Sequence, residues 1–543
     1  MFATTLDTIK HLLPELILVL CGAWLFVGGT WRAERWFWTT FSLASYLIAA
    51  LALFRQGYHL DPITAEATGT IQVSAFGNAI RWLALSAGIL LSLLGVNSAR
   101  KGMGAEFLGG VMMIVVGLMI TARANDLVLL FVGIELVSVP TYMLLFLGRR
   151  DRPAAEAAGK YFFLSILASA VLLYGFSFLY GISGATLICG TNEFPGIREK
   201  LASLVAANVN SELFYLLSPA LVFIVAGLGF KLAAVPFHFY APDVYQGTSS
   251  SNAAILAVAP KIAGLAALLK ICVVVAPMSS STRFGDFGWQ LLVVVAALTM
   301  SIGNMCALWQ THLRRLLAYS SIAHSGYMLI GVAVLMASTE QDGVSMGGAA
   351  SSLLYLALYS FASIGAFSVI ALWRSDNQEV NSIEELAGGG QSRPAAAAAL
   401  AVFMFSFAGI PPLAGFWGKF ALFGNAVSIA ISPEDHAKQA WFSALAVIAA
   451  INAAIGAAYY LRVISTLYFK KSTETVAASS IWLRPSFASA MVCLVVVLGI
   501  GLYTRPFTKL AGDAEQSLYF RQDGSGLAVV KPVSPPIATA EIK

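Results

Sequence analysis

The sequence has 543 residues, of which 58% are hydrophobic and 11% are charged, and its mean hydropathy is +0.78. Soluble domains carry about 25% charged residues, so this composition excludes a soluble globular protein and indicates a polytopic membrane protein. The formal net charge of +5 is ordinary for a membrane protein with basic inner loops and gives no reason to expect nucleic acid as a partner.

Five cysteines are spread along the chain without forming a recognisable ligand set. They show no CxxC pair and no cluster with histidine, and most lie in or beside apolar runs: Cys21, Cys189, Cys272, Cys306 and Cys493. This pattern is typical of small core residues. The chain also lacks a glycine-rich dinucleotide-binding motif and a P-loop. The sequence therefore argues against an iron–sulfur, haem or zinc site, and we expect the chain itself to bind no cofactor or metal.

Apolar segments of membrane-spanning length follow one another along almost the whole chain. A hydrocarbon core of about 30 Å requires about 20 apolar residues per helix. The sequence therefore predicts an all-α membrane protein with about 14 transmembrane helices. Numbered 1 to 14 in chain order, they lie at roughly 11–30, 36–54, 80–98, 106–122, 127–147, 160–182, 213–234, 251–276, 289–309, 315–336, 347–373, 396–430, 440–469 and 486–503. After Thr504 the polarity is mixed and prolines recur, so we expect the tail to be a surface extension.

Basic residues are unevenly distributed between the loops. Lysine and arginine favour the inner side of a membrane. An outer N-terminus puts the following residues inside: Arg32, Arg35, Arg100, Lys101, Arg149, Arg150, Arg152, Arg314, Arg315, Arg374, Arg393, Lys470 and Lys471. The sequence thus predicts a multi-pass protein of the bacterial inner membrane with both termini in the periplasm.

Two of the expected spans contain helix-breaking residues. Helix 7 runs into Pro236, and helix 12 passes through Pro411 and Pro412. Proline removes a backbone donor, so the freed carbonyls must face protein or water instead of lipid. The breaks lie five spans apart, as in transporters built from two inverted five-helix repeats. We therefore divide the chain into N-terminal helices 1–3 (1–105), a first unit (106–280), a second unit (281–470), and helix 14 with a polar tail (471–543).

Four ionisable residues stand isolated in these apolar segments: Glu135, Lys231, Lys261 and Lys419. A charge at the centre of a lipid-exposed helix costs about 2.5–3.5 kcal/mol on insertion scales, so such residues are expected to face a buried ion path. Desolvation disfavours a charged group and an opposite charge favours it. A lysine that gains and loses a carboxylate partner can therefore bind and release a proton. The alternative is a static ion pair that holds helices together.

His324 lies in helix 10 among hydroxyl-bearing residues, including Tyr319 and Ser320. Imidazole and hydroxyl groups can line a hydrated proton wire, and we take these three residues as candidates for one. A lone helical histidine is also common as a packing residue, and this alternative stays open.

The remaining polar residues in apolar surroundings have structural interpretations. His238 and Asp243 follow the helix 7 break and are expected to tie its end. Lys270 lies near the outer end of helix 8 and is expected to reach the interface by snorkelling. Glu15 is expected at the membrane interface or against a neighbouring subunit, and Arg462 either pairs with a carboxylate or reaches the inner surface.

Several of these residues fall in motifs that resemble a known family. The motifs are GIEL at 133–136, FK at 230–231, PFH at 236–238, PDVYQG at 242–247, APKIA at 259–263, LAYSSIAHSGY at 317–327 and GIPPLAGFWGKF at 409–420. Together they resemble the antiporter-like membrane subunits of respiratory complex I, NADH:quinone oxidoreductase, and most closely its subunit N. The sequence departs at Tyr240, where the family usually has tryptophan, and at 248–251, where it usually has a proline-containing segment.

This resemblance implies a role for each charged residue. Glu135 would modulate Lys231, Lys261 would relay the proton, and Lys419 would stand in the exit half of the path. The chain would be a proton-translocating translocase subunit of the membrane arm, packed against other membrane-arm subunits and lipid. NADH, FMN, iron–sulfur clusters and quinone would belong to partner subunits. Two alternatives remain: a subunit of a multisubunit cation/proton antiporter, and a scaffold whose buried charges only lock helices.

Overall fold

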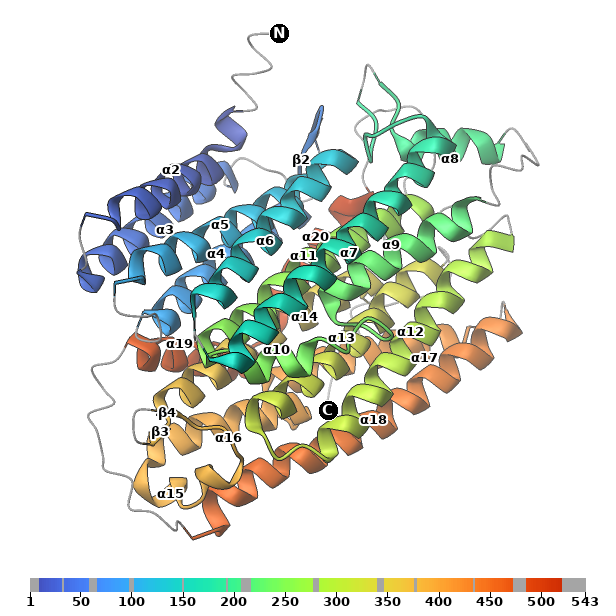
Figure 1. The fold of residues 1–543 in the computed structure, drawn as a ribbon. Coiled ribbons are helices and arrows are strands. Elements are labelled where there is room, and N and C mark those ends of the chain that lie inside the picture. Colours follow the sequence, from blue (N-terminus) through green and yellow to red (C-terminus); the bar gives the residue numbers. More distant parts are fainter. Residues whose placement is uncertain are drawn as a thin grey trace, which may run out of the picture.

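The computed structural model describes residues 9–31, 34–57, 66–96, 102–148, 151–191, 194–206, 216–276, 283–338, 346–375, 378–432, 435–471 and 485–519. Its elements are a bundle of long helices with a few short segments at the two ends of the bundle (Figure 1). The long helices are α2 (Leu13–Gly28), α3 (Arg35–Gly57), α4 (Ala75–Gly95), α5 (Gly104–Arg123), α6 (Leu127–Leu147), α7 (Arg152–Ser183), α9 (Leu217–Leu232), α11 (Ser250–Val275), α12 (Arg283–Leu308), α13 (Leu313–Ala337), α14 (Gly348–Leu372), α16 (Pro394–Ala408), α17 (Ala414–Ala430), α18 (His436–Phe469) and α19 (Pro485–Leu502).

The shorter elements connect these helices or cover their ends. They are β1 (Glu66–Thr68), β2 (Ile71–Val73), α8 (Ile197–Ala206), α10 (Ala241–Gly247), β3 (Arg374–Ser375), β4 (Gln378–Glu379), η3 (Glu384–Leu386), α15 (Gly389–Ser392) and α20 (Arg505–Tyr519). The strands form two antiparallel hairpins, β1 with β2 and β3 with β4.

Within the described residues, 11 helices are long and apolar enough to cross a membrane, and three shorter apolar helices accompany them. The all-α membrane class is therefore confirmed, whereas the count of 14 spans stays a prediction. Helix α6 begins and ends where the sequence predicted. Helix α4 begins at Ala75, five residues before the predicted 80, because Ser74 caps its first turn by accepting from the Gly77 amide. Such caps satisfy N–H groups that the helix leaves without partners.

Helices α11 and α13 lie at the centre of the bundle (Figure 1). Every residue of α11 is buried, and α13 is buried along almost its whole length. Their lysine and histidine side chains therefore face protein and not lipid, as the energetics of a charge in hydrocarbon require.

Both expected helix breaks are present. Helix α9 ends at Leu232, where Ala233 takes a left-handed backbone conformation with φ of 55°; the short helix α10 follows from Ala241. Helix α16 ends at Ala408, where Gly409 has φ of 85°, and α17 begins beyond the two prolines. Each break frees carbonyl groups at the end of a half-helix in the interior of the bundle.

The prediction that the segment after Thr504 is a surface extension was wrong for its first part. Residues Arg505–Tyr519 form helix α20, which packs against α4 and α14 and buries Ala511, Ala514 and Leu518. Small and apolar residues on one face of an otherwise polar helix explain this docking. The rest of the tail, 520–543, lies outside the described residues.

Candidate functional site

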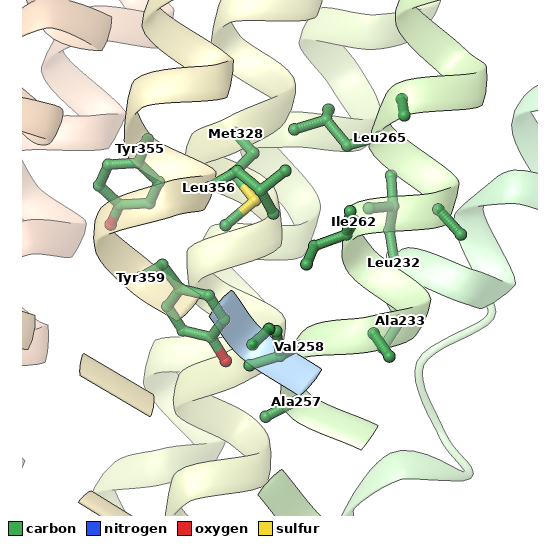
Figure 2. Close-up of a cluster of buried hydrophobic side chains, with 14 of the residues drawn as sticks. Leu232, Ala233, Ala257, Val258, Ile262, Leu265, Met328, Tyr355, Leu356 and Tyr359 are labelled. Atoms are coloured by element: carbon green, nitrogen blue, oxygen red, sulfur yellow. The ribbon is translucent and has the colours of Figure 1, made fainter. Parts of the chain in front are cut away.

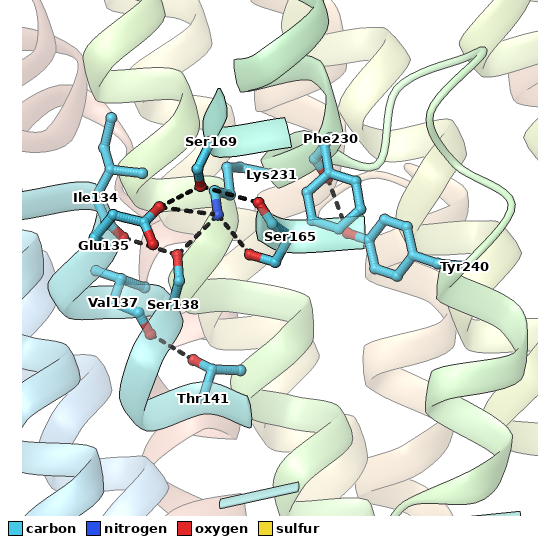
Figure 3. Close-up of polar contacts among 10 residues, drawn as sticks. All are labelled: Ile134, Glu135, Val137, Ser138, Thr141, Ser165, Ser169, Phe230, Lys231 and Tyr240. Carbon is cyan, nitrogen blue, oxygen red and sulfur yellow. Dashed lines mark hydrogen bonds and ion pairs between the residues drawn. The ribbon is translucent and has the colours of Figure 1, made fainter. Parts of the chain in front are cut away.

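Lys231 and Glu135 face each other in the interior, with serines around them (Figure 3). The Lys231 Nζ atom lies 3.7 Å from Glu135 Oε1 and donates hydrogen bonds to Ser138 Oγ at 2.8 Å and Ser165 Oγ at 2.9 Å. Ser169 donates to Glu135 Oε1 at 2.5 Å. The lysine side chain is 2% exposed and that of the glutamate 25%. The ammonium is therefore held by neutral hydroxyls and drawn electrostatically to one carboxylate.

Lys261 lies at the first helix break. Its Nζ donates to the Leu232 carbonyl at 3.1 Å, the last residue of α9. The Ser325 hydroxyl of α13 donates to the same oxygen at 2.5 Å. A cation at the C-terminal end of a helix is favoured by the helix dipole. The break therefore creates the site that holds Lys261, with no carboxylate required.

Lys419 repeats this arrangement at the second break. Its Nζ donates to the carbonyls of Phe407 at 2.9 Å and Ala408 at 3.0 Å, the last residues of α16. It also lies 5.1 Å from the centre of the Tyr327 ring, within cation–π distance. Both half-helix ends thus present free carbonyls to a buried ammonium.

His324 occupies the region between the two breaks. Its Nδ1 lies 2.6 Å from the Tyr355 hydroxyl and its Nε2 2.9 Å from the Tyr460 hydroxyl, and it interacts electrostatically with both Lys261 and Lys419. Ser320 is hydrogen-bonded to Tyr460. The structure thus brings His324 and Ser320 into one polar cluster.

Tyr319 stands apart from this cluster. It is half-buried on another face of α13 and packs against the apolar core. Adjacent helical residues point in different directions, which explains why Ser320 reaches Tyr460 and Tyr319 does not. Its role in a proton wire stays a prediction without geometric support.

Apolar side chains enclose these polar groups. Figure 2 shows Leu232, Ile262, Met328 and Leu356 packed together from α9, α11, α13 and α14, and all four are completely buried. A dry surrounding strengthens electrostatic interactions and makes an unpaired polar group costly. The buried ammonium groups therefore depend on the few oxygens that they contact.

The loop after the first break is fixed at the end of the bundle opposite to α20. Asp243 forms ion pairs with Lys160 of α7 at 2.7 Å and Arg315 of α13 at 2.8 Å. Burial alone would raise the pKa of Asp243, but Lys160 and Arg315 hold it below its ordinary value. Tyr240 donates to the Phe230 carbonyl at 2.9 Å. The expectation that Asp243 ties the broken end is confirmed, and the tyrosine that replaces the usual tryptophan makes a bond of its own.

The segment 248–251, the other departure from the family pattern, starts helix α11. Ser249 accepts from the Asn252 amide and caps the helix. Glu379 of β4 accepts from the Ser250 amide at 2.9 Å and from its hydroxyl at 2.8 Å, and it pairs with Arg314 at 2.8 Å. The hairpin therefore fastens the beginnings of α11 and α13.

Two interpretations of isolated charges were wrong. Lys270 does not snorkel, because it is buried and its Nζ donates to the Ala124 carbonyl at 2.7 Å. Glu15 does not face the surface but forms a buried ion pair with Arg81 at 2.7 Å. The partners lie 146 residues away for Lys270 and 66 residues away for Glu15, so hydropathy could not reveal them.

Of the two alternatives for Arg462, pairing with a carboxylate does not occur among the described residues. Its guanidinium donates to the carbonyls of Leu308 at 2.8 Å and Gln310 at 2.6 Å, at the end of α12. It therefore caps that helix end, and its position at the inner surface stays a prediction.

Several residues of the site were missed in the sequence. Ser138 and Ser165 hold Lys231, Tyr355 and Tyr460 hold His324, and Ser325 shares the Leu232 carbonyl with Lys261. Serines and tyrosines are common in membrane helices. Ser138 offered one signal, because it lies three residues after Glu135 on the same helix face.

The motifs and the geometry agree with known proteins. The family described as NADH:quinone oxidoreductase/Mrp antiporter, TM, matches residues 124–432, a range that includes Glu135, Lys231, Lys261 and Lys419. NADH-quinone oxidoreductase subunit N of Rhodospirillum rubrum is 38% identical over 474 residues, which are 86% of this chain and 89% of that relative. The chain belongs to the subunit N family.

Solved structures agree with this membership. A chain of respiratory complex I from Thermus thermophilus shares 27% identity with this chain, with a TM-score of 0.71 over 92% of this chain and 100% of that one. A chain of the Mrp complex from a Dietzia species has a TM-score of 0.74 at 20% identity, over 95% of this chain and 98% of that one. At that identity the second likeness concerns the fold alone.

Proposed function

We propose that this chain is a proton-translocating subunit in the membrane arm of a bacterial NADH:quinone oxidoreductase. The observation that carries the proposal is the set of three buried ammonium groups, Lys231, Lys261 and Lys419, each beside a break or a carboxylate in the apolar interior. Buried ionisable groups in membrane proteins mark ion paths by default. The name shared by the curated relatives supplies the redox partner of this activity.

The first step in the proposed mechanism is a change at the Glu135–Lys231 pair. When the carboxylate approaches, the ammonium form of Lys231 is favoured; when it withdraws, the proton is more readily released. Ser138 and Ser165 keep the side chain in position in both states, because their hydroxyls accept from the ammonium and can donate to the neutral amine. The electrostatic signal would come from quinone reduction in neighbouring subunits.

The proton would then pass Lys261 and His324 to Lys419. The two lysines contact backbone carbonyl oxygens, and His324 contacts two tyrosine hydroxyls. All of these groups can exchange hydrogen bonds with water. The freed carbonyls at the two breaks can stabilise a protonated lysine without neutralising it. The half-helices in this scheme correspond to the two proposed units, 106–280 and 281–470, with α9/α10 and α16/α17 in equivalent places.

The remaining assignments belong to the same proposal. NADH, FMN, iron–sulfur clusters and quinone are bound by partner subunits, and this chain contacts other membrane-arm subunits and lipid. The face that carries α20 is the periplasmic one. The N-terminal end of α2 lies on this face too, because Arg81 of α4 bonds to the His11 carbonyl and Phe76 of α4 bonds to Ser517.

A matched pair of lysines on one helix tests the proposal. Lys261→Met and Lys270→Met each remove a buried ammonium that donates to a backbone carbonyl, so the two variants are a matched pair. The Leu232 carbonyl keeps its Ser325 donor, so Lys261→Met should disturb the structure no more than Lys270→Met does. In the assembled complex, we expect Lys261→Met to lower proton pumping and NADH:quinone turnover at least about tenfold and Lys270→Met to leave pumping close to that of the unmodified complex. Equal pumping in the two variants, with both assembled, would contradict the proposal.

The cation/proton antiporter remains a second candidate because the Mrp chain has the same fold. Purification of the tagged chain from mildly solubilised membranes separates the two. Flavin and iron–sulfur subunits with NADH:quinone turnover are expected to co-purify. Membrane subunits alone, with sodium-dependent proton movement and no NADH oxidation, would favour the antiporter instead.

A further inference from the structure

Helix α20 caps two other helices with side chains that are two residues apart. Ser517 Oγ accepts from the Phe76 amide at the start of α4 at 2.9 Å. Glu515 Oε1 accepts from the Ala349 amide at the start of α14 at 3.1 Å. The serine is neutral at every pH of interest, whereas the glutamate can exchange a proton. A structural cap requires no such group, since a serine serves at α4.

Glu515 is a buried carboxyl with no ion pair to any of the described residues. It is 9% exposed, and an added Cβ at Gly347 would meet its oxygens at 2.0 Å, so the carboxyl packs directly against the backbone of Gly347. Burial raises the pKa of the Glu515 carboxyl to about 7, while the amides of Ala349, Ala350 and Gly347 oppose this change. A carboxyl whose pKa lies near 7 exchanges its proton readily near neutral pH.

Few titratable groups surround it. Tyr519 lies one turn further along α20, with Cys272 of α11 and Arg198 of α8 beyond it. The first turns of α14 and α4 contribute no charged residue, and Arg81, deeper in α4, is paired with Glu15. Lys270 of α11 lies 5.8 Å from the Phe76 ring and donates to the Ala124 carbonyl, without an ion pair to Glu515. Protonation of Glu515 is therefore not fixed by a neighbouring charge.

Asn425 connects this carboxyl to the helix of Lys419. Lys419, Leu422 and Asn425 share the buried face of α17, and six residues of helix correspond to about 9 Å along the axis. Asn425 Nδ2 donates to the Gly347 carbonyl and to Ser351 Oγ, each at 3.1 Å. Asn425 and Glu515 thus bind the same first turn of α14 from opposite helices. Leu422 is the apolar residue between this turn and Lys419.

We propose that Glu515 receives the proton released by Lys419 and passes it to the aqueous phase on the α20 side of the membrane. The Lys419 ammonium would lose a proton through water to the Glu515 carboxylate, giving a neutral amine and a neutral carboxylic acid. The acid would then release the proton to the bulk. This inference rests on the proposed function and assigns Glu515 as the last proton-carrying residue of the proposed path.

Replacing Glu515 by glutamine distinguishes a proton-carrying residue from a structural cap. Glu515→Gln keeps an oxygen that accepts from the Ala349 amide but cannot exchange a proton, and Glu515→Asp keeps a carboxyl. Ser517→Ala removes the neighbouring cap and is the matched control. We expect Glu515→Gln in the assembled complex to lower pumping about tenfold or more and to flatten its pH dependence between roughly pH 6 and 8. Glu515→Asp should recover most of the activity, and Ser517→Ala should keep the unmodified pH profile.

Pumping by Glu515→Gln at the unmodified rate and with the unmodified pH profile would overturn the inference. The inference would also be overturned if Ser517→Ala and Glu515→Asp both lost pumping and Glu515→Gln lost no more than they did. Glu515 would then be a structural cap. Lys419→Met is measured beside them: if it pumps normally, the proposed function itself fails. If Lys419→Met is inactive and Glu515→Gln is normal, only the assignment of Glu515 fails.

Discussion

Lys231 Nζ lies 3.7 Å from Glu135 Oε1, within ion-pair distance but beyond a hydrogen bond. The ammonium directs its hydrogen bonds to serine hydroxyls instead, and the carboxylate has a serine donor of its own. Each partner therefore has hydrogen bonds that do not depend on the other. This arrangement allows the pair to weaken or tighten at a smaller cost than a hydrogen-bonded buried pair, in which separation leaves both groups unsatisfied.

Glu135→Gln removes the charge of the carboxylate and keeps an oxygen for Ser169. Because the fold loses no hydrogen bond, we expect normal assembly, with proton pumping lowered about tenfold or more as Lys231 loses its electrostatic partner. Pumping in inverted membrane vesicles with NADH as substrate measures this effect. Glu156→Gln is the control, because Glu156 is an exposed residue paired with Lys160. Similar pumping in the two variants would argue for a static role of Glu135.

Ser165→Ala removes one of the two hydroxyls that hold the Lys231 ammonium. A lost hydrogen bond to a charged group costs about 1.5–3 kcal/mol, so the charged form of Lys231 should become more dependent on Glu135. We expect a severalfold loss of pumping, and a combined loss with Glu135→Gln that is not the product of the single losses, because both act on one ammonium. Ser177→Ala on the same helix is the control, since Ser177 is exposed and its hydroxyl donates to the Tyr174 carbonyl of its own helix. Independent, multiplicative effects would contradict a shared site.

Gly409→Ala tests the second helix break. Gly409 has φ of 85°, and an added Cβ would lie 2.9 Å from Lys419 Cδ. A left-handed conformation costs a non-glycine residue about 1–2 kcal/mol, and the methyl group would displace the lysine from the carbonyls of Phe407 and Ala408. We expect lower thermal stability of the assembled complex and a large loss of pumping. Gly424→Ala on α17 is the control, because nothing lies within 4 Å of its added Cβ; equal behaviour of the two variants would contradict this account.

Much of this fold could be predicted because its determinants are local. Hydropathy placed α6 and α11 within one residue, and proline and glycine placed both breaks. The charged residues of the proposed path were visible because an isolated lysine in an apolar run is rare. The partners of these residues were not visible: the carbonyls that bind Lys261 and Lys419 have no sequence signature, since every residue has one. Helix α20 was missed for a related reason, because its buried face consists mainly of small residues.

Glu515 should make the first turn of α14 sensitive to pH. Its pKa is raised from 4.5 to about 7 in the folded protein, so folding favours the protonated carboxyl. The resulting stabilisation is fully present below about pH 4.5 and is lost as the pH rises to about 7, by an amount on the order of 3 kcal/mol. Hydrogen exchange at the Ala349 amide, corrected for intrinsic rates, should therefore show easier opening as the pH rises through this window. In Glu515→Gln the corrected exchange rate at Ala349 should not change with pH. The Phe76 amide, which is capped by Ser517, is a second control, and its corrected exchange rate should be independent of pH even in the unmodified protein. An identical pH response at Ala349 in the Gln variant would show that another group titrates there.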